Sequence, residues 1–129
     1  MINGIGTDLV EKERVENLFL KYGNRFVDKI LTKSERKEFD NRKGKEKKIS
    51  FLSNNFASKE AVSKALDTGF SSGITLKNIE ILRKDSGSPY LNLKGKAEKQ
   101  ALKKKCLNFK LSISDTKYYS LAFVIGEEE

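Results

Sequence analysis

The sequence has no histidine and no tryptophan, and it contains one cysteine, Cys106, and one proline, Pro89. Without histidine, the Ser-His-Asp triad, the Cys-His dyad and the usual Cys/His zinc site are all excluded. A single cysteine cannot form a disulfide within the chain, and Cys106 is more typical of a small core residue than of a nucleophile. Any general base must therefore be Asp, Glu, Lys or Tyr, or a water molecule held by one of them.

Long hydrophobic runs are also missing. No apolar stretch approaches the ~20 residues that a membrane-spanning helix needs. The opening "MINGIGTDLV" has neither the basic region nor the long apolar stretch of a signal peptide. We therefore expect a soluble, cytoplasmic protein with no membrane partner. The 129 residues suit one domain, 1–129.

Positive charge is abundant, because the chain has 26 Lys and Arg residues and 18 Asp and Glu residues, which gives a net charge of +8. Such a surface attracts polyanions, among them nucleic acid, phosphorylated cofactors and acidic proteins. The basic runs 43–48 and 103–105 contain no interleaved aromatic residue, so a solvated face is the simpler interpretation. A small basic nucleic-acid-binding module without catalysis remains the alternative function.

Hydrophobic spacing predicts the order β-α-α-α-β-β-α-β-β. This order indicates an α+β fold, a single compact domain with an antiparallel sheet packed on a long helix. The first half is expected to contain an opening strand, helices over 10–22, 24–31 and 32–40, a mobile basic loop over 41–48 and the longest helix over 49–67. The helix over 32–40 is expected to begin with a Thr32–Glu35 capping box. The second half is expected to contain strands over 74–82 and 90–93, a basic helix over 94–105, and a hairpin over 107–125 whose second strand is buried on both faces.

Two carboxylates stand out by position. Asp8 is expected where the first strand passes into a helix, and Glu60 lies on the same helical stripe as Phe56 and Lys64, at steps of four residues. Mg²⁺ commonly takes one or two protein carboxylates and completes its shell with water and substrate phosphates. Asp8, Glu60 and a nearby Lys64 therefore suit the handling of a phosphorylated substrate. Alternatively, Asp8 caps the following helix and Glu60 forms a routine salt bridge with Lys64.

Several stretches together resemble the bacterial holo-acyl-carrier-protein synthase family. Its members are small trimeric 4′-phosphopantetheinyl transferases. The resemblance begins with "GIGTDLVEKERV" and "FASKEAVSKAL", and it continues through "NIEI" and "SGSPYLNL" to "LSISDTKYYSLAFVI". These blocks keep their order and spacing over nearly the whole chain. The first two are the specific ones, because they combine Gly-Ile-Gly-x-Asp with Phe-Ala-x-Lys-Glu-Ala-x-x-Lys-Ala.

The resemblance implies the transfer of 4′-phosphopantetheine from coenzyme A to a serine of apo acyl carrier protein, with release of adenosine 3′,5′-bisphosphate. It implies that Asp8 and Glu60 hold Mg²⁺, and that Asp8, Glu60 and Lys64 are catalytic. The absence of histidine agrees with this chemistry, since phosphoryl transfer depends mainly on positioning and electrostatics. The resemblance also implies a set of residues that bind coenzyme A: Ser63, Lys64, Gly87, Pro89 and Thr116.

For the acidic carrier protein, the resemblance implies a basic and apolar docking face that includes Arg14, Arg25 and Phe26. Family precedent further implies a homotrimer with active sites shared between neighbouring subunits. Nucleic acid and membranes are not expected as partners. A homologue that binds a carrier without modifying it is a third alternative.

The chain departs from the family pattern at particular positions. Asp115 follows Ser112 and Ser114 where a histidine is common, Asn55 replaces a common arginine, and Asp67 replaces the usual glycine. With these changes, coenzyme A affinity is expected to rest more on Lys64 and on the loop lysines, which are Lys43, Lys45 and Lys47.

Overall fold

The computed structural model describes residues 1–129 and contains five strands and five α-helices. In chain order the elements are β1 (Ile2–Glu11), α1 (Lys12–Tyr22), α2 (Asn24–Ile30), α3 (Lys33–Asn41), α4 (Lys45–Ala65), the short 3₁₀ helix η1 (Leu76–Asn78), β2 (Ile79–Arg83), β3 (Pro89–Leu93), α5 (Gly95–Lys104), β4 (Asn108–Asp115) and β5 (Tyr119–Glu127). No helix combines the length and the apolar character that crossing a membrane requires.

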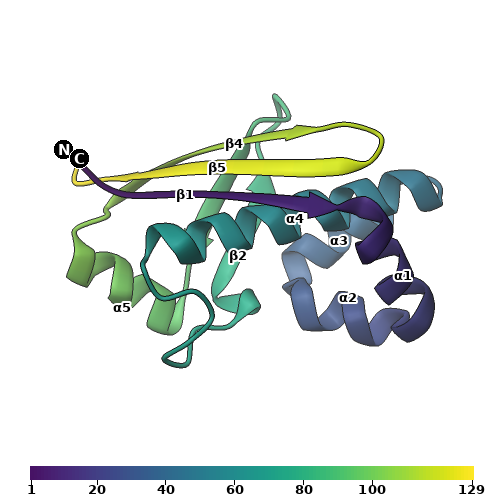
Figure 1. The fold of residues 1–129 in the computed structure, drawn as a ribbon, viewed down its shortest axis with the longest axis horizontal. Coiled ribbons are helices and arrows are strands. Elements are labelled where there is room, and N and C mark those ends of the chain that lie inside the picture. The colour runs from purple at the N-terminus through teal and green to yellow at the C-terminus, as the bar shows by residue number, and fades with distance from the viewer.

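The strands form two antiparallel sheets, one of three strands in the order β1-β5-β4 and one that consists of β2 and β3. Figure 1 shows the larger sheet lying along α4, with α1, α2 and α3 gathered at one end and α5 at the other. Both chain termini lie at the α5 end. The predicted α+β class with antiparallel pairing is confirmed, although the strands divide between two sheets.

Glycine residues on β1 allow α4 to approach the sheet closely. A Cβ atom on Gly6 would lie 1.9 Å from the carbonyl oxygen of Ala61, and one on Gly4 would lie 2.5 Å from that of Ala65. No side chain fits in this space, so the two glycines and the two alanines together set the distance between strand and helix. The backbones of β1 and α4 are therefore in close contact at the opening glycines.

The long helix differs from its prediction at both ends. It begins at Lys45 and not at Ile49, so most of the predicted mobile loop over 41–48 is helical. Lysine and glutamate are good helix formers, and a helix can begin in a segment that has no apolar residue when the following turns are buried. At the other end the helix stops at Ala65, and Asp67 follows with a left-handed φ of 64°. This conformation favours glycine, and aspartate tolerates it better than most residues.

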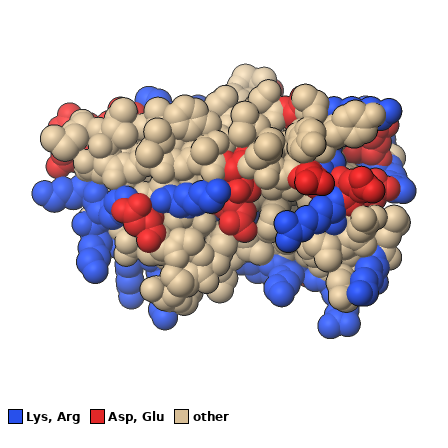
Figure 2. All heavy atoms as spheres, viewed as in Figure 1, with Lys and Arg blue, Asp and Glu red and all other residues tan.

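The predicted burial of the last strand on both faces is wrong for the single chain. Along β5, buried Ser120, Ala122 and Val124 alternate with exposed Leu121 and Phe123. The inner residues pack on α4, whereas the outer ones lie uncovered beside β1. In Figure 2 the atoms along the top, over this sheet, are mainly uncharged, while lysine and arginine side chains project from the lower half. The sheet therefore leaves one apolar face open.

Candidate functional site

Asp8 and Lys64 meet where β1 crosses the last turn of α4. The Lys64 ammonium lies 3.0 Å from Asp8 Oδ1 and also donates to the Thr7 carbonyl oxygen at 3.0 Å. The Asp8 side chain is 17% exposed and that of Lys64 is 52% exposed, so the pair lies at the mouth of a cleft. Glu60, one helical turn before Lys64, lines the same cleft as Asp8.

Both parts of the alternative interpretation are wrong. Asp8 lies inside β1, which continues to Glu11, and α1 has no side-chain cap at its start. Lys64 forms its salt bridge with Asp8, and Glu60 forms none. The spacing of four residues did bring Glu60 and Lys64 to one face, but the strand that passes over this face offers Lys64 a better partner.

The electrostatics of Glu60 show that the two carboxylates influence each other. Burial raises the pKa of Glu60 above its ordinary value, and the Asp8 carboxylate raises it further. The positive charges of Lys64 and Arg14 oppose this increase. A half-buried glutamate beside a second carboxylate is costly to ionise, and a cation placed between them would remove that cost.

The donor set fits Mg²⁺. Asp8 and Glu60 offer two carboxylates in one cleft, and nowhere in the chain are three or more acidic or cysteine side chains grouped so that they could hold a metal ion. Mg²⁺ usually binds to one or two carboxylates and keeps its remaining positions for water and substrate phosphates, so two protein ligands are sufficient.

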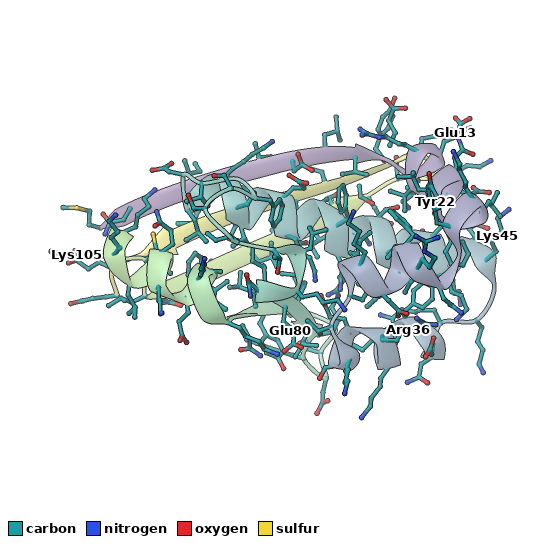
Figure 3. All side chains as sticks on the ribbon, turned by 90° about the horizontal axis from the view of Figure 1, so that it is seen from below. Glu13, Tyr22, Arg36, Lys45, Glu80 and Lys105 are labelled. Atoms are coloured by element: carbon teal, nitrogen blue, oxygen red, sulfur yellow. The ribbon has the colours of Figure 1, made fainter.

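The cleft that contains Asp8 and Glu60 has a volume of about 320 Å³ and is otherwise lined mainly by apolar side chains of β1, α1, α2 and α4. Two of the residues predicted to bind the carrier protein, Arg14 and Phe26, are in its wall. The third, Arg25, lies with Phe26 in an adjoining apolar hollow of about 490 Å³ that also includes Tyr22. Tyr22 lies at the α1 end of the molecule, opposite Lys105 (Figure 3). The structure therefore brings the predicted docking residues together beside the predicted metal ligands.

The residues predicted to bind coenzyme A are not together in the single chain. Ser63 is fully buried, and its hydroxyl donates to the Glu60 carbonyl oxygen at 2.7 Å. Gly87 lies in the exposed turn between β2 and β3, with a φ of 92°, and Pro89 begins β3. Thr116 lies in the turn after β4, where its hydroxyl accepts a hydrogen bond from the Tyr119 N–H at 3.0 Å.

These positions fall on opposite edges of the larger sheet. β1, which carries Asp8, forms one edge, and β4, which ends just before Thr116, forms the other. The hairpin of β2 and β3, with Gly87 and Pro89, packs beside β4. One chain therefore presents Asp8, Glu60 and Lys64 on one side and Gly87, Pro89 and Thr116 on the other.

Lys59, the neighbour of Glu60, is fully buried and paired with fully buried Glu35. Lys59 Nζ lies 2.7 Å from Glu35 Oε1 and also donates to the carbonyl oxygens of Ile30 at 2.6 Å and Leu76 at 3.0 Å. Burial lowers the pKa of Lys59, and Glu35 opposes this decrease. The pair connects α4 to α2, α3 and η1, and so it sets how α4 presents the adjacent Glu60.

Asn55 and Asp115, two of the departures from the family pattern, are both committed to other side chains. Fully buried Asn55 donates to Glu35 Oε2 at 3.1 Å and accepts a hydrogen bond from Arg83 at 2.8 Å. Asp115 lies 2.7 Å from Lys12 Nζ. Neither side chain is free to bind a phosphate itself.

Asp67, the third departure, lies 2.6 Å from Lys104 Nζ. Of the loop lysines, Lys45 pairs with Glu16 at 2.7 Å and Lys43 is exposed. Lys47 lines a polar hollow of about 480 Å³, which we call the basic hollow. Its walls are Arg42, Glu46, Lys47, Ser50, Phe51, Asn54 and Arg83.

Sequence reasoning missed Lys59, Lys12 and Arg83 as organising residues. Lys59 and Glu35 are 24 positions apart, and Lys12 and Asp115 are 103 positions apart. Local spacing rules act over three or four residues and carry no signal for such pairs.

Comparison with known proteins places these features in a family. Residues 4–124 match the sequence profile described as "4'-phosphopantetheinyl transferase superfamily". The chain is 42% identical over 126 residues to the holo-[acyl-carrier-protein] synthase of Aliivibrio salmonicida, with 98% of each chain covered. The crystal structure of this synthase from Neisseria meningitidis superposes with a TM-score of 0.89 at 35% identity, covering 98% of this chain and 99% of that one. The Bacillus anthracis synthase in complex with coenzyme A (3',5'-ADP) superposes with a TM-score of 0.84 at 32% identity, covering 100% of this chain and 99% of that one.

Proposed function

The chain belongs to the 4′-phosphopantetheinyl transferase superfamily, among its holo-acyl-carrier-protein synthases, and on this premise we propose how it acts. It transfers 4′-phosphopantetheine from coenzyme A to a serine of apo acyl carrier protein and releases adenosine 3′,5′-bisphosphate. The observation that carries the proposal is the meeting of Asp8, Glu60 and Lys64 at one cleft beside a basic and apolar surface.

Asp8 and Glu60 are the proposed Mg²⁺ ligands. When bound, Mg²⁺ neutralises charge on the pyrophosphate of coenzyme A and on the departing nucleotide. The serine proton would pass to a water molecule held by the metal or to Glu60. The serine oxygen forms a bond to the phosphorus next to pantetheine, and the bridging P–O bond to the adenosine phosphate breaks.

Lys64 positions and neutralises the pyrophosphate. Its ammonium has three hydrogens, of which two are directed to Asp8 and Thr7 in this structure. The third remains for a phosphate oxygen at the open mouth of the cleft. The ion pair with Asp8 thus holds the lysine where the leaving group departs.

Arg14, Arg25 and Phe26 form the proposed docking face for acyl carrier protein. Arg14 and Phe26 line the cleft, and Arg25 borders the adjoining apolar hollow. A basic rim around apolar pockets suits an acidic partner helix, because opposite charges steer the encounter and set the orientation.

We also propose a homotrimer. The outer face of the larger sheet leaves Ile5, Leu9, Leu121 and Phe123 exposed by 41–64%, a continuous apolar surface that a second chain would cover. The proposed coenzyme A residues lie on opposite sheet edges, and assembly would allow one chain's Asp8 edge to meet another chain's Thr116 edge. We further expect the enzyme in the cytoplasm, which cell fractionation would test.

The transfer is tested by incubating the protein with coenzyme A, Mg²⁺ and apo acyl carrier protein and weighing the carrier by mass spectrometry. We expect the gain of one phosphopantetheine, its loss on chelation of the metal, and its recovery when Mg²⁺ is restored. Asp8→Asn should abolish the gain. A competent carrier that gains no mass would refute the proposal, and salt-sensitive binding to DNA or RNA would then favour the nucleic-acid alternative.

A further inference from the structure

The C-terminal end of α4, which carries Lys64 in its last turn, is incomplete by itself. The last carbonyl oxygens of a helix have no partner within the helix and need donors from elsewhere. Those of Ser63 and Lys64 accept hydrogen bonds from backbone N–H groups of the turn 67–69. Those of Ala65 and Leu66 accept none from the backbone. The end of the helix therefore depends on side chains for its last two acceptors.

Both donors come from α5. Lys104 Nζ donates to the Ala65 carbonyl oxygen at 2.8 Å, and Gln100 Nε2 donates to that of Leu66 at 2.9 Å. The two donors are four residues apart on α5 and so share one of its faces. A cation also interacts favourably with the negative end of a helix dipole. One helix thus caps the end of another, and Figure 1 shows α5 beside that end of α4.

Lys104 is itself held in place by Asp67. Its side chain is 20% exposed, and its ammonium lies 2.6 Å from Asp67 Oδ2. Asp67 follows α4 in the left-handed conformation, at the position where the family usually has glycine. A glycine would fit the backbone but would leave the ammonium without this carboxylate. The departure from the family pattern therefore strengthens the cap on α4.

The Ala65 carbonyl oxygen connects this cap to β1. A Cβ atom on Gly4 would lie 2.5 Å from the same oxygen that accepts the hydrogen bond from Lys104. The peptide of Ala65 is thus fixed by α5 and in contact with the strand that carries Asp8. Because Lys64 directly precedes Ala65, any movement of this peptide moves Lys64 relative to Asp8.

Lys64 needs a well-ordered last turn. Its side chain is 52% exposed and reaches across to Asp8 Oδ1 and the Thr7 carbonyl oxygen from the end of the helix. Helix ends fray when their caps are lost. A misplacement of about 1 Å at a reacting centre can reduce the rate about a hundredfold. Loosening of this turn should therefore reduce the transfer rate while most of α4, which is buried, keeps its structure.

We propose that Lys104 and Gln100 are positioning residues for the transfer reaction, which cap α4 and thereby hold Lys64 at Asp8. This inference rests on the proposed function, in which Lys64 meets the substrate pyrophosphate. Neither residue contacts the substrate, and both act through Lys64. The basic run 103–105 is thus not uniform, since Lys103 and Lys105 are exposed whereas Lys104 supports the site.

The test is a double-mutant cycle in activity, with Lys104→Met, Lys64→Met and the double variant. Mass spectrometry of the carrier over time gives kcat/KM for coenzyme A with Mg²⁺ present. Lys104→Met alone should lower this value about tenfold, because Lys64 is no longer held at Asp8. In the Lys64→Met background the same change should cost less than about twofold, because the side chain that it positions is gone. A merely structural role would give the same loss in both backgrounds.

Amide hydrogen exchange provides a second measure, independent of activity. Exchange over 62–66, the last turn of α4, should be faster in Lys104→Met than in the wild type, and exchange over 51–58 should be unchanged. Lys104→Arg, which keeps a cationic donor, should restore the activity to within about threefold of the wild type. Lys103→Met, which removes the exposed neighbouring charge, is the matched control and should change neither measure.

Thermal unfolding reports whether each variant has folded, and Gln100→Leu repeats the cycle if Lys104→Met does not fold. Equal losses in the two backgrounds, full activity of Lys104→Met, or unchanged exchange over 62–66 would refute the positioning role and leave the transfer itself intact. Full activity of Lys64→Met would refute the role of Lys64 and this inference with it. A wild-type chain that modifies no competent carrier would instead refute the proposed function.

Discussion

Lys12 and Asp115 form a buried-to-surface salt bridge of 2.7 Å that joins the start of α1 to the end of β4. The same ammonium donates to the Thr116 carbonyl oxygen at 2.6 Å and to Ser50 Oγ at 3.0 Å, so all three of its hydrogens are used. Asp115, which departs from the common family histidine, is therefore an anchor for the β4–β5 turn. Its carboxylate holds the Lys12 ammonium, which in turn donates to the Thr116 carbonyl oxygen.

The strength of this anchor is measurable in a double-mutant cycle. Asp115→Ala leaves the Lys12 ammonium nearly buried with one acceptor missing, and should destabilise the fold by about 1–2 kcal/mol. Lys12→Met should cost a similar amount. Because each change removes the same contact, the double variant should cost less than the sum, by about 1 kcal/mol. Urea denaturation measures all three, and strictly additive costs would contradict the anchor.

Glu60→Gln should separate activity from stability. Loss of the proposed metal ligand should reduce kcat at least about a hundredfold. Removal of a carboxylate that is costly to ionise beside Asp8 should leave the melting temperature unchanged or raise it. Carrier mass spectrometry and thermal unfolding measure the two effects. A variant that loses activity and stability together would show that Glu60 mainly supports the fold.

The pH dependence of stability provides a second measure of Glu60. The pKa of Glu60 in the folded chain lies above the ordinary value of 4.5, which applies to the unfolded chain. At a pH between these two pKa values, the folded chain therefore binds more protons than the unfolded chain. Stability contributed by the protonated group is thus complete below pH 4.5 and is lost as the pH rises through the folded pKa. The stability of Glu60→Gln relative to the wild type should grow over that window. Added Mg²⁺ at neutral pH should raise the wild-type melting temperature and not that of the variant, and an equal rise in both would exclude Glu60 as a ligand.

Lys59→Met should be among the most destabilising single changes, because it leaves Glu35 fully buried without a counter-charge. The expected cost is about 3–5 kcal/mol, measured by urea denaturation. Lys64→Met on the same helix is the control, since its ammonium is half-exposed and its removal should cost less than about 1 kcal/mol. Equal costs for the two lysines would contradict the burial of the Lys59 pair. The double variant Lys59→Met/Glu35→Gln should recover part of the loss.

Leu121→Asp should disrupt the proposed trimer without unfolding the chain. Leu121 lies opposite Leu9 in the sheet register, and the two side chains are 42% and 63% exposed in the single chain. A charge is tolerated on an exposed face but not within an apolar interface. Chromatography with light scattering should give the mass of three chains for the wild type and of one for the variant, with loss of transferase activity. Lys99→Asp, on the exposed side of α5, should remain a trimer. A trimeric, fully active Leu121→Asp would refute this interface.

Arg14→Ala should weaken the binding of acyl carrier protein while leaving the binding of coenzyme A intact. Arg14 is exposed on α1 at the wall of the Asp8 cleft, where an acidic helix would approach. The carrier affinity should fall about tenfold and depend less on salt. Separate titrations with carrier and with coenzyme A measure this, and Lys33→Ala on α3 is the control. Equal loss of both affinities would mean that Arg14 supports the catalytic cleft as a whole.

The candidate site was predictable where chemistry follows from residues close together in the sequence. The motif around Glu60 and Lys64 and the glycines before Asp8 identified the residues that the structure brings to one cleft. The partner of Lys64 was not predictable from spacing. An i, i+4 rule describes an isolated helix, and it cannot include the strand β1 that crosses this face and supplies Asp8.

The sequence by itself determined the element types, the antiparallel α+β class and the excluded chemistries, because hydrophobic periodicity and residue inventory are local properties. Only the tertiary structure decided which charges meet: Lys59 with Glu35, Lys12 with Asp115, and Asn55 with Arg83. It also decided that the outer face of β5 is exposed in the single chain. The sequence shows that apolar residues lie on both faces of this strand, but it does not show which face another element covers. Such contacts join residues far apart along the chain, and their free energies depend on burial and on partners that appear only when the elements pack.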